Sequence, residues 1–173
     1  TVLPFWEDYY AGGSRTLRGF ESNSVGGRAI YRRKVPVNPN DNQPPYLPSS
    51  EDQIYVSGAL GGNAKAVATF ELITPTPFLD EAYKHSVRTS VFVDVGNVWD
   101  TEFDYSKYKD LALASGSREF YDYSDPSAYR ASYGLSLQWL SPMGPMVFSF
   151  ARPIKKQPGD STEFFSFNIG TTF

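Results

Sequence analysis

The residues best suited to chemistry in this chain are one arginine and two carboxylates. Arg18 follows a glycine-rich stretch that begins at Gly12-Gly13, and Glu71 and Asp94 lie on the polar faces of two alternating segments further along the chain. A guanidinium that is carried out of water needs a partner, and its planar fork suits a carboxylate best. These residue types predict ion pairing rather than bond-making chemistry. The alternative is that Arg18 is a solvated loop charge and that the two carboxylates only line a polar face.

No residue set in the chain points to catalysis or to a bound metal. The single histidine, His85, has neither an orienting acid nor a shielded nucleophile near it in the sequence, so a hydrolase of the Ser-His-carboxylate type is disfavoured. Asp122 and Asp125 could hold a weak calcium ion, but a polar surface loop is the preferred interpretation. Gly12-Gly13 is not followed by the Lys-Ser or Lys-Thr pair of a phosphate-binding loop. We therefore expect no enzymatic activity, no cofactor and no metal.

The composition of the chain excludes two further classes of protein. The chain has 173 residues, a net charge of -3 at pH 7, no cysteine, 16% aromatic residues and a mean hydropathy of -0.38. These values fit one domain rich in β-forming residues and argue against nucleic acid as a partner. The longest nearly apolar run, Met143 to Ala151, is far shorter than the ~18 residues of a membrane-spanning helix. Thr1 is not an initiator methionine and no signal sequence follows it, so we expect a processed chain or a piece of a longer one.

Five segments from Ala64 onward alternate between apolar and polar residues. Their apolar faces are formed by Ala64, Ala66, Ala68, Phe70 and Leu72; by Val87, Thr89, Val91, Val93 and Val95; by Tyr129, Ala131, Tyr133, Leu135, Leu137 and Trp139; by Met146, Phe148 and Phe150; and by Phe165, Phe167, Ile169 and Phe173. The fourth segment is expected to stop at Pro153. This pattern is typical of a transmembrane β-barrel with a polar lumen, and it predicts an all-β, antiparallel, up-and-down barrel. A soluble β-sandwich is the alternative.

Residues 1–63 lack this alternation and are rich in glycine and proline, which predicts a long loop before the strand region at 64–173. Bacterial barrels usually have an even number of strands and both ends in the periplasm, so five strands predict a fragment of a larger barrel. The same count makes residues 1–63, Thr101–Ser127 and Pro153–Thr162 extracellular. It makes the proline-rich segment Thr74–His85 and the turn at Ser141–Gly144 periplasmic.

Several short motifs then appear in a recognisable order. They are Gly12-Gly13-Ser14-Arg15-Thr16-Leu17-Arg18-Gly19-Phe20, Gly61-Gly62-Asn63-Ala64, Phe70-Glu71-Leu72-Ile73-Thr74-Pro75-Thr76-Pro77-Phe78, Val93-Asp94-Val95-Gly96-Asn97-Val98-Trp99-Asp100, Tyr123-Ser124-Asp125-Pro126-Ser127, Gln138-Trp139-Leu140-Ser141-Pro142-Met143-Gly144-Pro145 and Phe167-Asn168-Ile169-Gly170. This ordered set resembles the BamA family of outer-membrane assembly factors, within the bacterial surface antigens. The range Arg32 to Leu60 shows no family pattern.

The resemblance implies the last five strands of a sixteen-stranded barrel in the bacterial outer membrane, preceded by the sixth extracellular loop as a lid. It implies a part in folding and inserting outer-membrane proteins without covalent chemistry. The implied partners are the lipoprotein subunits of an assembly complex, unfolded outer-membrane proteins, and the lipid bilayer with its lipopolysaccharide. For lipopolysaccharide phosphates, Arg32-Arg33-Lys34 is a candidate, although a solvated charge run is the default interpretation.

Two sites follow from the resemblance. In the first, Arg18 locks the lid inside the barrel through Glu71 and Asp94, Gly19 permits close approach, and Phe20 packs on the wall. In the second, the terminal strand is one side of a lateral gate that accepts an incoming strand by β-augmentation, with Gly170 loosening the strand. The residues of this strand are Phe165, Phe167, Ile169, Gly170 and Phe173. An ordinary closing strand is an equally good interpretation of these residues.

Three other functions stay open at this stage. A related translocation or secretion barrel shares the Arg-Gly-Phe loop, a passive porin shares the strand pattern, and a soluble sandwich could act as a binding module. We also expect the isolated chain to self-associate, because the segments Ala64–Thr74 and Glu163–Phe173 would be exposed strand edges.

Overall fold

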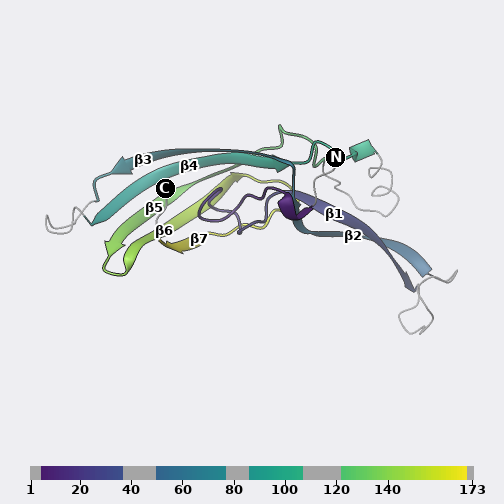
Figure 1. The fold of residues 1–173 in the computed structure, drawn as a ribbon, viewed down its shortest axis with the longest axis horizontal. Helices are drawn as coiled ribbons and strands as arrows, with labels where there is room; N and C mark the ends of the chain where they lie inside the picture. The colour runs from purple at the N-terminus through teal and green to yellow at the C-terminus, as the bar shows by residue number, and fades with distance from the viewer. Residues whose placement is uncertain (1–4, 37–49, 77–85, 107–121, 171–173) are drawn as a thin grey trace.

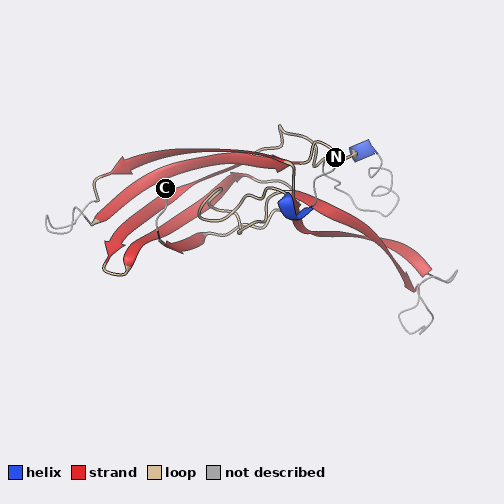
Figure 2. Cartoon of the chain, in the orientation of Figure 1, coloured by secondary structure: helices blue, strands red, loops and turns tan. Residues whose placement is uncertain are grey.

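The computed structural model describes residues 5–36, 50–76, 86–106 and 122–170, and β-strands dominate them (Figures 1 and 2). After a short 3-10 helix, η1 at Phe5–Glu7, the strands are β1 Gly27–Pro36, β2 Ser50–Gly61, β3 Ala64–Thr74, β4 Val87–Trp99, β5 Arg130–Ser141, β6 Gly144–Lys155 and β7 Phe165–Ile169. No helix in the described part of the chain is long and apolar enough to cross a membrane.

The five strands β3 to β7 form one antiparallel sheet in which every strand pairs with its neighbours in the sequence. The all-β, up-and-down arrangement that the alternation predicts is therefore confirmed. The sheet is long and curved, and the loop of residues 8–26, which we call the motif loop, lies on its concave side (Figure 1). The predicted turn between Ser141 and Gly144 joins β5 to β6.

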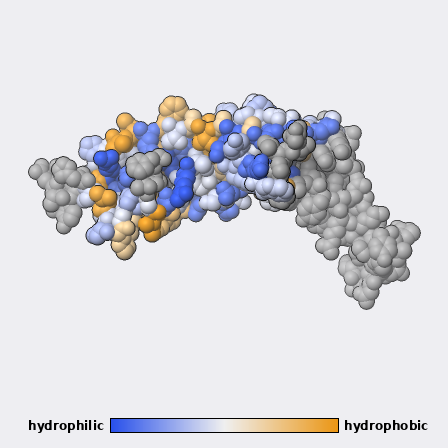
Figure 3. All heavy atoms as spheres, in the orientation of Figure 1, coloured by the Kyte–Doolittle hydropathy of each residue, from blue (hydrophilic) through white to orange (hydrophobic). Residues whose placement is uncertain are grey.

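The two faces of the sheet follow the alternation of the sequence. On the convex face, large apolar side chains are exposed, among them Phe70, Leu72, Val91, Val93, Tyr133, Leu135, Phe150 and Ile169. On the concave face most buried residues are small or polar, among them Ser90, Asp94, Ser132, Ser136 and Ser149, and Phe92 is a large apolar exception. Apolar residues are spread over the part of the molecule that the sheet forms (Figure 3). An apolar outside and a polar inside are what a membrane barrel wall requires.

Residues 1–63 contain a structure that the sequence did not predict. Strands β1 and β2 form a two-stranded antiparallel hairpin, which extends away from the five-stranded sheet (Figure 1). Its register runs from Gly27 opposite Gly61 to Pro36 opposite Ser50, with Lys34 opposite Asp52. The sequence of residues 1–63 shows little sustained alternation of apolar and polar residues, which is why these two strands were not expected.

Strand β6 also departs from the prediction, because it continues through Pro153 to Lys155. Its pairing with β5 shifts at this point, since Ser132 faces Pro153 while Ala131 faces Lys155. Proline lacks a donor for the ladder and is accommodated at such a bulge. Strand β7, by contrast, is short: it ends at Ile169, and Phe173 lies outside the described residues.

Candidate functional site

The motif loop is folded by its glycines and by local hydrogen bonds. Gly12, Gly13 and Gly19 have φ angles of +106°, +87° and +90°, a region that favours glycine. A Cβ on Gly12 would lie 2.1 Å from the carbonyl oxygen of Glu21, so no other residue fits there. The amide of Gly13 donates to the carbonyl of Phe20 at 2.8 Å, which closes the loop behind Arg18.

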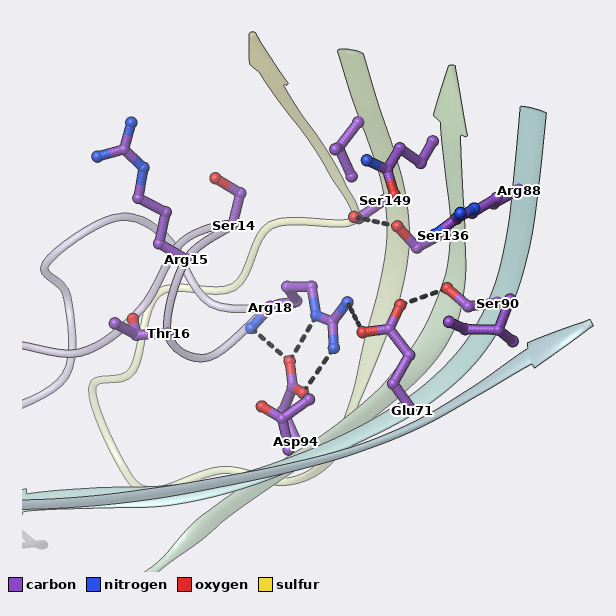
Figure 4. A pocket seen from close by; sticks show the side chains of 14 residues that line it. Ser14, Arg15, Thr16, Arg18, Glu71, Arg88, Ser90, Asp94, Ser136 and Ser149 are labelled. Atoms are coloured by element: carbon purple, nitrogen blue, oxygen red, sulfur yellow. Dashed lines mark hydrogen bonds and ion pairs between the residues drawn. The ribbon is translucent and has the colours of Figure 1, made fainter. Parts of the chain in front are cut away.

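Arg18 extends from this loop to Asp94 on β4 and binds its carboxylate through two nitrogens of the guanidinium, Nε and Nη2 (Figure 4). Its Nε and Nη2 each donate to one carboxylate oxygen at 2.8 Å, and its main-chain amide donates to Oδ2 at 3.1 Å. Asp94 is 1% exposed and Arg18 is 8% exposed. A bidentate, charge-assisted pair of this kind is the strongest polar contact between two side chains.

Two further groups surround the same guanidinium. The Arg18 Cζ atom lies 3.3 Å from the centre of the Phe92 ring, which places the cation on an aromatic face. Glu71 on β3 lies 3.6 Å from Nη1, and its carboxylate accepts a hydrogen bond from Ser90. The Glu71 side chain is 37% exposed, so water screens this second ion pair far more than the first.

Gly19 and Phe20 hold the loop in place beside the arginine. A Cβ on Gly19 would lie 3.2 Å from the Cβ atoms of both Ser132 and Ala151, so the loop and the sheet touch closely here. The Ser132 hydroxyl donates to the carbonyl of Arg18. Phe20 is fully buried, but most of its apolar cluster comes from the loop itself: Ala11, Leu17 and Val25, with Val98 of β4 as the contribution of the wall.

The motif loop also pairs through its main chain with the segment that precedes β7. The amide of Glu21 donates to the carbonyl of Ser161, and the amide of Glu163 donates to the carbonyl of Gly19, both at 3.1 Å. Between these bonds, Phe20 and Thr162 form an antiparallel bridge. The loop is thus attached next to the start of the terminal strand, a contact that carries no signal in the sequence because it uses only the main chain.

A second buried arginine, Arg130, lies at the start of β5 and was not singled out from the sequence. Its Nε and Nη2 donate to the two carboxylate oxygens of Asp160 at 2.9 and 3.0 Å, and its Nη1 donates to Asn97 of β4. Asn97 in turn donates to the carbonyls of Asp125 and Pro126. We call these three side chains the rim network, because they join β4, β5 and two connecting segments at one end of the sheet.

Beside Arg18 lies a cavity of about 760 Å³. Besides Arg18, its charged lining residues are Arg15, Glu71, Arg88 and Asp94, with Gln138, Ser136 and Ser149 among the polar ones (Figure 4). Within the described residues no group of three or more histidine, cysteine or acidic side chains could hold a metal ion. The arrangement can hold charges and water, and it brings no nucleophile and base together.

Asp122 and Asp125, the two candidates for calcium, are engaged in turns. Asp122 accepts hydrogen bonds from the amide and the hydroxyl of Ser124 at 2.9 and 2.6 Å. Asp125 accepts from the amide of Ser127 at 2.8 Å, and its hydrogen bonds with this residue hold the pKa of the carboxyl below its usual range. Local turn bonds therefore account for both carboxylates. His85 lies outside the described residues.

Among the strands of the described residues, the terminal strand β7 pairs only with β6. Phe165, Phe167 and Ile169 are 43%, 44% and 55% exposed on the convex face. Gly170 follows the strand with a φ of +120°, and its amide donates to the carbonyl of Pro145 at 2.9 Å. Along the other edge of β7, no strand among the described residues forms hydrogen bonds with it.

Comparisons with known proteins agree with this architecture. The model of the Omp85 superfamily domain matches residues 1–173. The outer membrane protein assembly factor BamA of Neisseria meningitidis serogroup B is 33% identical over 182 residues, which cover 99% of this chain and 19% of that protein. The crystal structure of Haemophilus ducreyi BamA lacking POTRA domains 1-3 superposes with a TM-score of 0.71 at 40% identity, covering 99% of this chain and 28% of that one. The chain thus spans about a fifth of the curated relative. It belongs to the Omp85 superfamily and forms a C-terminal part of an outer-membrane β-barrel of the BamA type.

Proposed function

We propose that this chain, as part of the full-length protein, helps to fold and insert β-barrel proteins into the outer membrane. Residues 1–63 act as a lid segment on the extracellular side, and residues 64–173 supply five strands of the barrel. The observation that carries the proposal is the buried bidentate pair between Arg18 and Asp94, which ties the lid to the wall. The likeness to two BamA proteins supports the same role.

The pair acts as a lock because neither charge can remain buried alone. Removing one partner of a buried ion pair costs about 3–5 kcal/mol, since the other charge is left without compensation. Arg18 therefore either stays on Asp94 or leaves for water together with its loop. The result is a lid with one strongly preferred position on the concave side of the sheet.

The free edge of β7 supports the second half of the proposal, a gate at which an incoming strand is added. The amide of Gly170 and the carbonyl of Phe164 both bond to β6, so in an antiparallel ladder the alternate residues, Phe165, Phe167 and Ile169, direct their main-chain groups to the free edge. An unfolded strand can pair with these groups by β-augmentation. Unfolded outer-membrane proteins are the substrates in this proposal, and lipoprotein subunits are partners of the full-length protein.

The lock is tested in the full-length protein that contains these residues, reconstituted in proteoliposomes. Arg18→Ala is expected to slow insertion of a model barrel protein and to expose Phe20 to chymotrypsin. Arg15→Ala, which removes an exposed arginine of the same loop, is the control and is expected to change neither. Wild-type insertion rates and wild-type protection in Arg18→Ala would contradict the lock.

The gate is tested at Phe167, whose main-chain amide points to the free edge. Phe167→Pro removes this donor, while Phe167→Ala removes the same ring and keeps the donor. We expect the proline variant to insert substrate several-fold more slowly than the alanine variant. Equal rates in the two variants, with both correctly folded by heat-modifiability on gels, would argue against strand addition at this edge.

A further inference from the structure

The convex face of the sheet changes from apolar to cationic at one end of β6. Going along the strand from the turn at Gly144, the outward residues are Met146, Phe148, Phe150 and then Arg152. The change occurs next to the segment that leads to β7, on the side where the motif loop is attached. A cation on a face that is otherwise apolar calls for an explanation, because lysine and arginine are costly on the lipid side of a barrel.

The bulge at Pro153 adds a second cation to this face. Because Ser132 faces Pro153 and Ala131 faces Lys155, Ile154 is the extra residue, and Lys155 takes the outward position that follows Arg152. Two ladder positions along a strand are about 7 Å apart. Arg152 and Lys155 therefore present a guanidinium and an ammonium close together on the outside of the wall.

Aromatic rings hold both cations on this surface. The Nζ atom of Lys155 lies 3.7 Å from the centre of the Tyr129 ring, and the Cζ atom of Arg152 lies 5.6 Å from the centre of the Phe164 ring. Tyr129 is 45% exposed and Phe164 is 57% exposed. We call these four side chains the outer patch.

The two cations differ from the buried arginines in what pairs with them. Arg18 and Arg130 each bind an aspartate, whereas neither Arg152 nor Lys155 forms an ion pair with any carboxylate in the described part of the chain. Besides the local turn hydrogen bonds, Lys155 lowers the pKa of the Asp125 carboxyl without forming an ion pair with it, and the exposed Arg152 has room for a ligand from outside the protein.

The level of the patch in the membrane identifies the kind of ligand. From Gly144 to Arg152 the strand rises about 26 Å, and a tilt of 35–45° reduces this to a height of about 20 Å. The apolar band of a barrel is about 25 Å tall, so a patch that begins at this height lies at the boundary between lipid tails and headgroups. A strand end next to the lid segment is the extracellular end, which faces the outer leaflet.

We propose that the outer patch is a binding site for the phosphate of a phosphorylated glycolipid of the outer leaflet, of the lipid A class. Arg152 and Lys155 contact the phosphate, which suits a guanidinium fork and an ammonium together. Tyr129 and Phe164 position the two cations and pack against the lipid below them. The site rests on the extracellular position of the lid segment proposed above, but it does not require that the protein inserts other barrels.

The test uses the full-length protein in detergent and measures bound lipid by native mass spectrometry. The probes are bisphosphorylated lipid A and the same lipid with its phosphates removed. The variants are Arg152→Gln with Lys155→Gln, and, as the matched control, Lys156→Gln, which alters an exposed lysine next to the patch. Heat-modifiability on gels shows that each variant is folded.

We expect the wild type to prefer the phosphorylated lipid, and the double variant to lose about tenfold in the bound fraction while Lys156→Gln keeps it. Loss of phosphorylated lipid in 0.5 M salt would support a charge-based site. Wild-type binding in the double variant would overturn the proposal. Equal binding of the phosphate-free lipid, or an equal loss in Lys156→Gln, would overturn it as well, because either result indicates an aromatic girdle or a general surface charge.

Discussion

Two buried arginines bind aspartates with nearly the same geometry but join different kinds of structure. Arg18 lies on a loop and binds Asp94, which is 76 residues away on β4. Arg130 lies on a strand and binds Asp160, which is 30 residues away in the β6–β7 connection. The first pair attaches a separate segment to the wall, whereas the second joins parts of the wall to each other.

The two arginines differ in whether they can move into water when their aspartate partner is lost. A loop can carry Arg18 out of the site into water, so the loss is limited to the free energy of docking the loop. A strand cannot do the same for Arg130 without breaking the sheet at β5. The same chemistry therefore attaches the motif loop in one place and stabilises the fold in the other.

The largest effect on stability is expected at Asp160. Asp160→Ala removes the bidentate carboxylate partner of the buried Arg130, and breaking a buried ion pair lowers the free energy of unfolding by about 3–5 kcal/mol. This change is measured by urea unfolding of the full-length protein in detergent, with heat-modifiability on gels as the readout of the folded fraction. A loss below 1 kcal/mol would mean that the rim network does not brace the wall, and the comparison would fail.

Asp94→Ala is expected to act on the lid rather than on global stability. A loss of about 3 kcal/mol in docking raises the open population about a hundredfold, because each 1.4 kcal/mol is a factor of ten. The rate of chymotrypsin cleavage at Phe20 reports this population, while the urea midpoint should fall less than in Asp160→Ala. A larger fall in the midpoint than in Asp160→Ala would reverse the assignment of the two pairs.

Gly19→Ala tests the close approach of the loop without removing any charge. The new Cβ would lie 3.2 Å from two neighbouring Cβ atoms, and the φ of +90° disfavours any side chain. A strained backbone of this kind costs about 1–2 kcal/mol, so cleavage at Phe20 should rise about tenfold. Gly144→Ala is the control, since it has a φ of +120° but open space around it, and it should leave the lid protected.

The smallest effect is expected at Glu71, whose ion pair with Arg18 is longer and partly exposed. Glu71→Gln keeps the shape of the side chain and should change lid cleavage less than fivefold, since exposed pairs contribute about 0–1 kcal/mol. A change as large as that of Asp94→Ala would show that both carboxylates share the lock equally.

The sequence predicted the strands whose side chains alternate between an apolar outer face and a polar inner face. The alternation in β3 to β7 predicted the sheet and placed Glu71 and Asp94 on its inner side. Membership of the Omp85 superfamily then removes the soluble sandwich as an alternative. Arg18 was tied to these carboxylates by the family resemblance, because spacing alone cannot bring together residues 76 positions apart.

Other features left no readable signal. The β1–β2 hairpin has no sustained alternation in its sequence, and the bulge at Pro153 depends on the register of two strands. The attachment of the motif loop to residues 161–163 uses main-chain groups, which every residue has. The pair of Arg130 and Asp160 could not be predicted, because it depends on how two connecting segments run, and their sequences show no periodic pattern.

The short link between the hairpin and the sheet gives the molecule a mechanical property. Strand β2 ends at Gly61 and β3 begins at Ala64, and the side chain of Asn63 bonds both the amide and the hydroxyl of Thr101 at the end of β4. A pull on the hairpin is therefore transmitted to β3, the first strand of the sheet, through a short connection that is hydrogen-bonded to the segment after β4. The hairpin and the edge strand β3 are thus mechanically coupled.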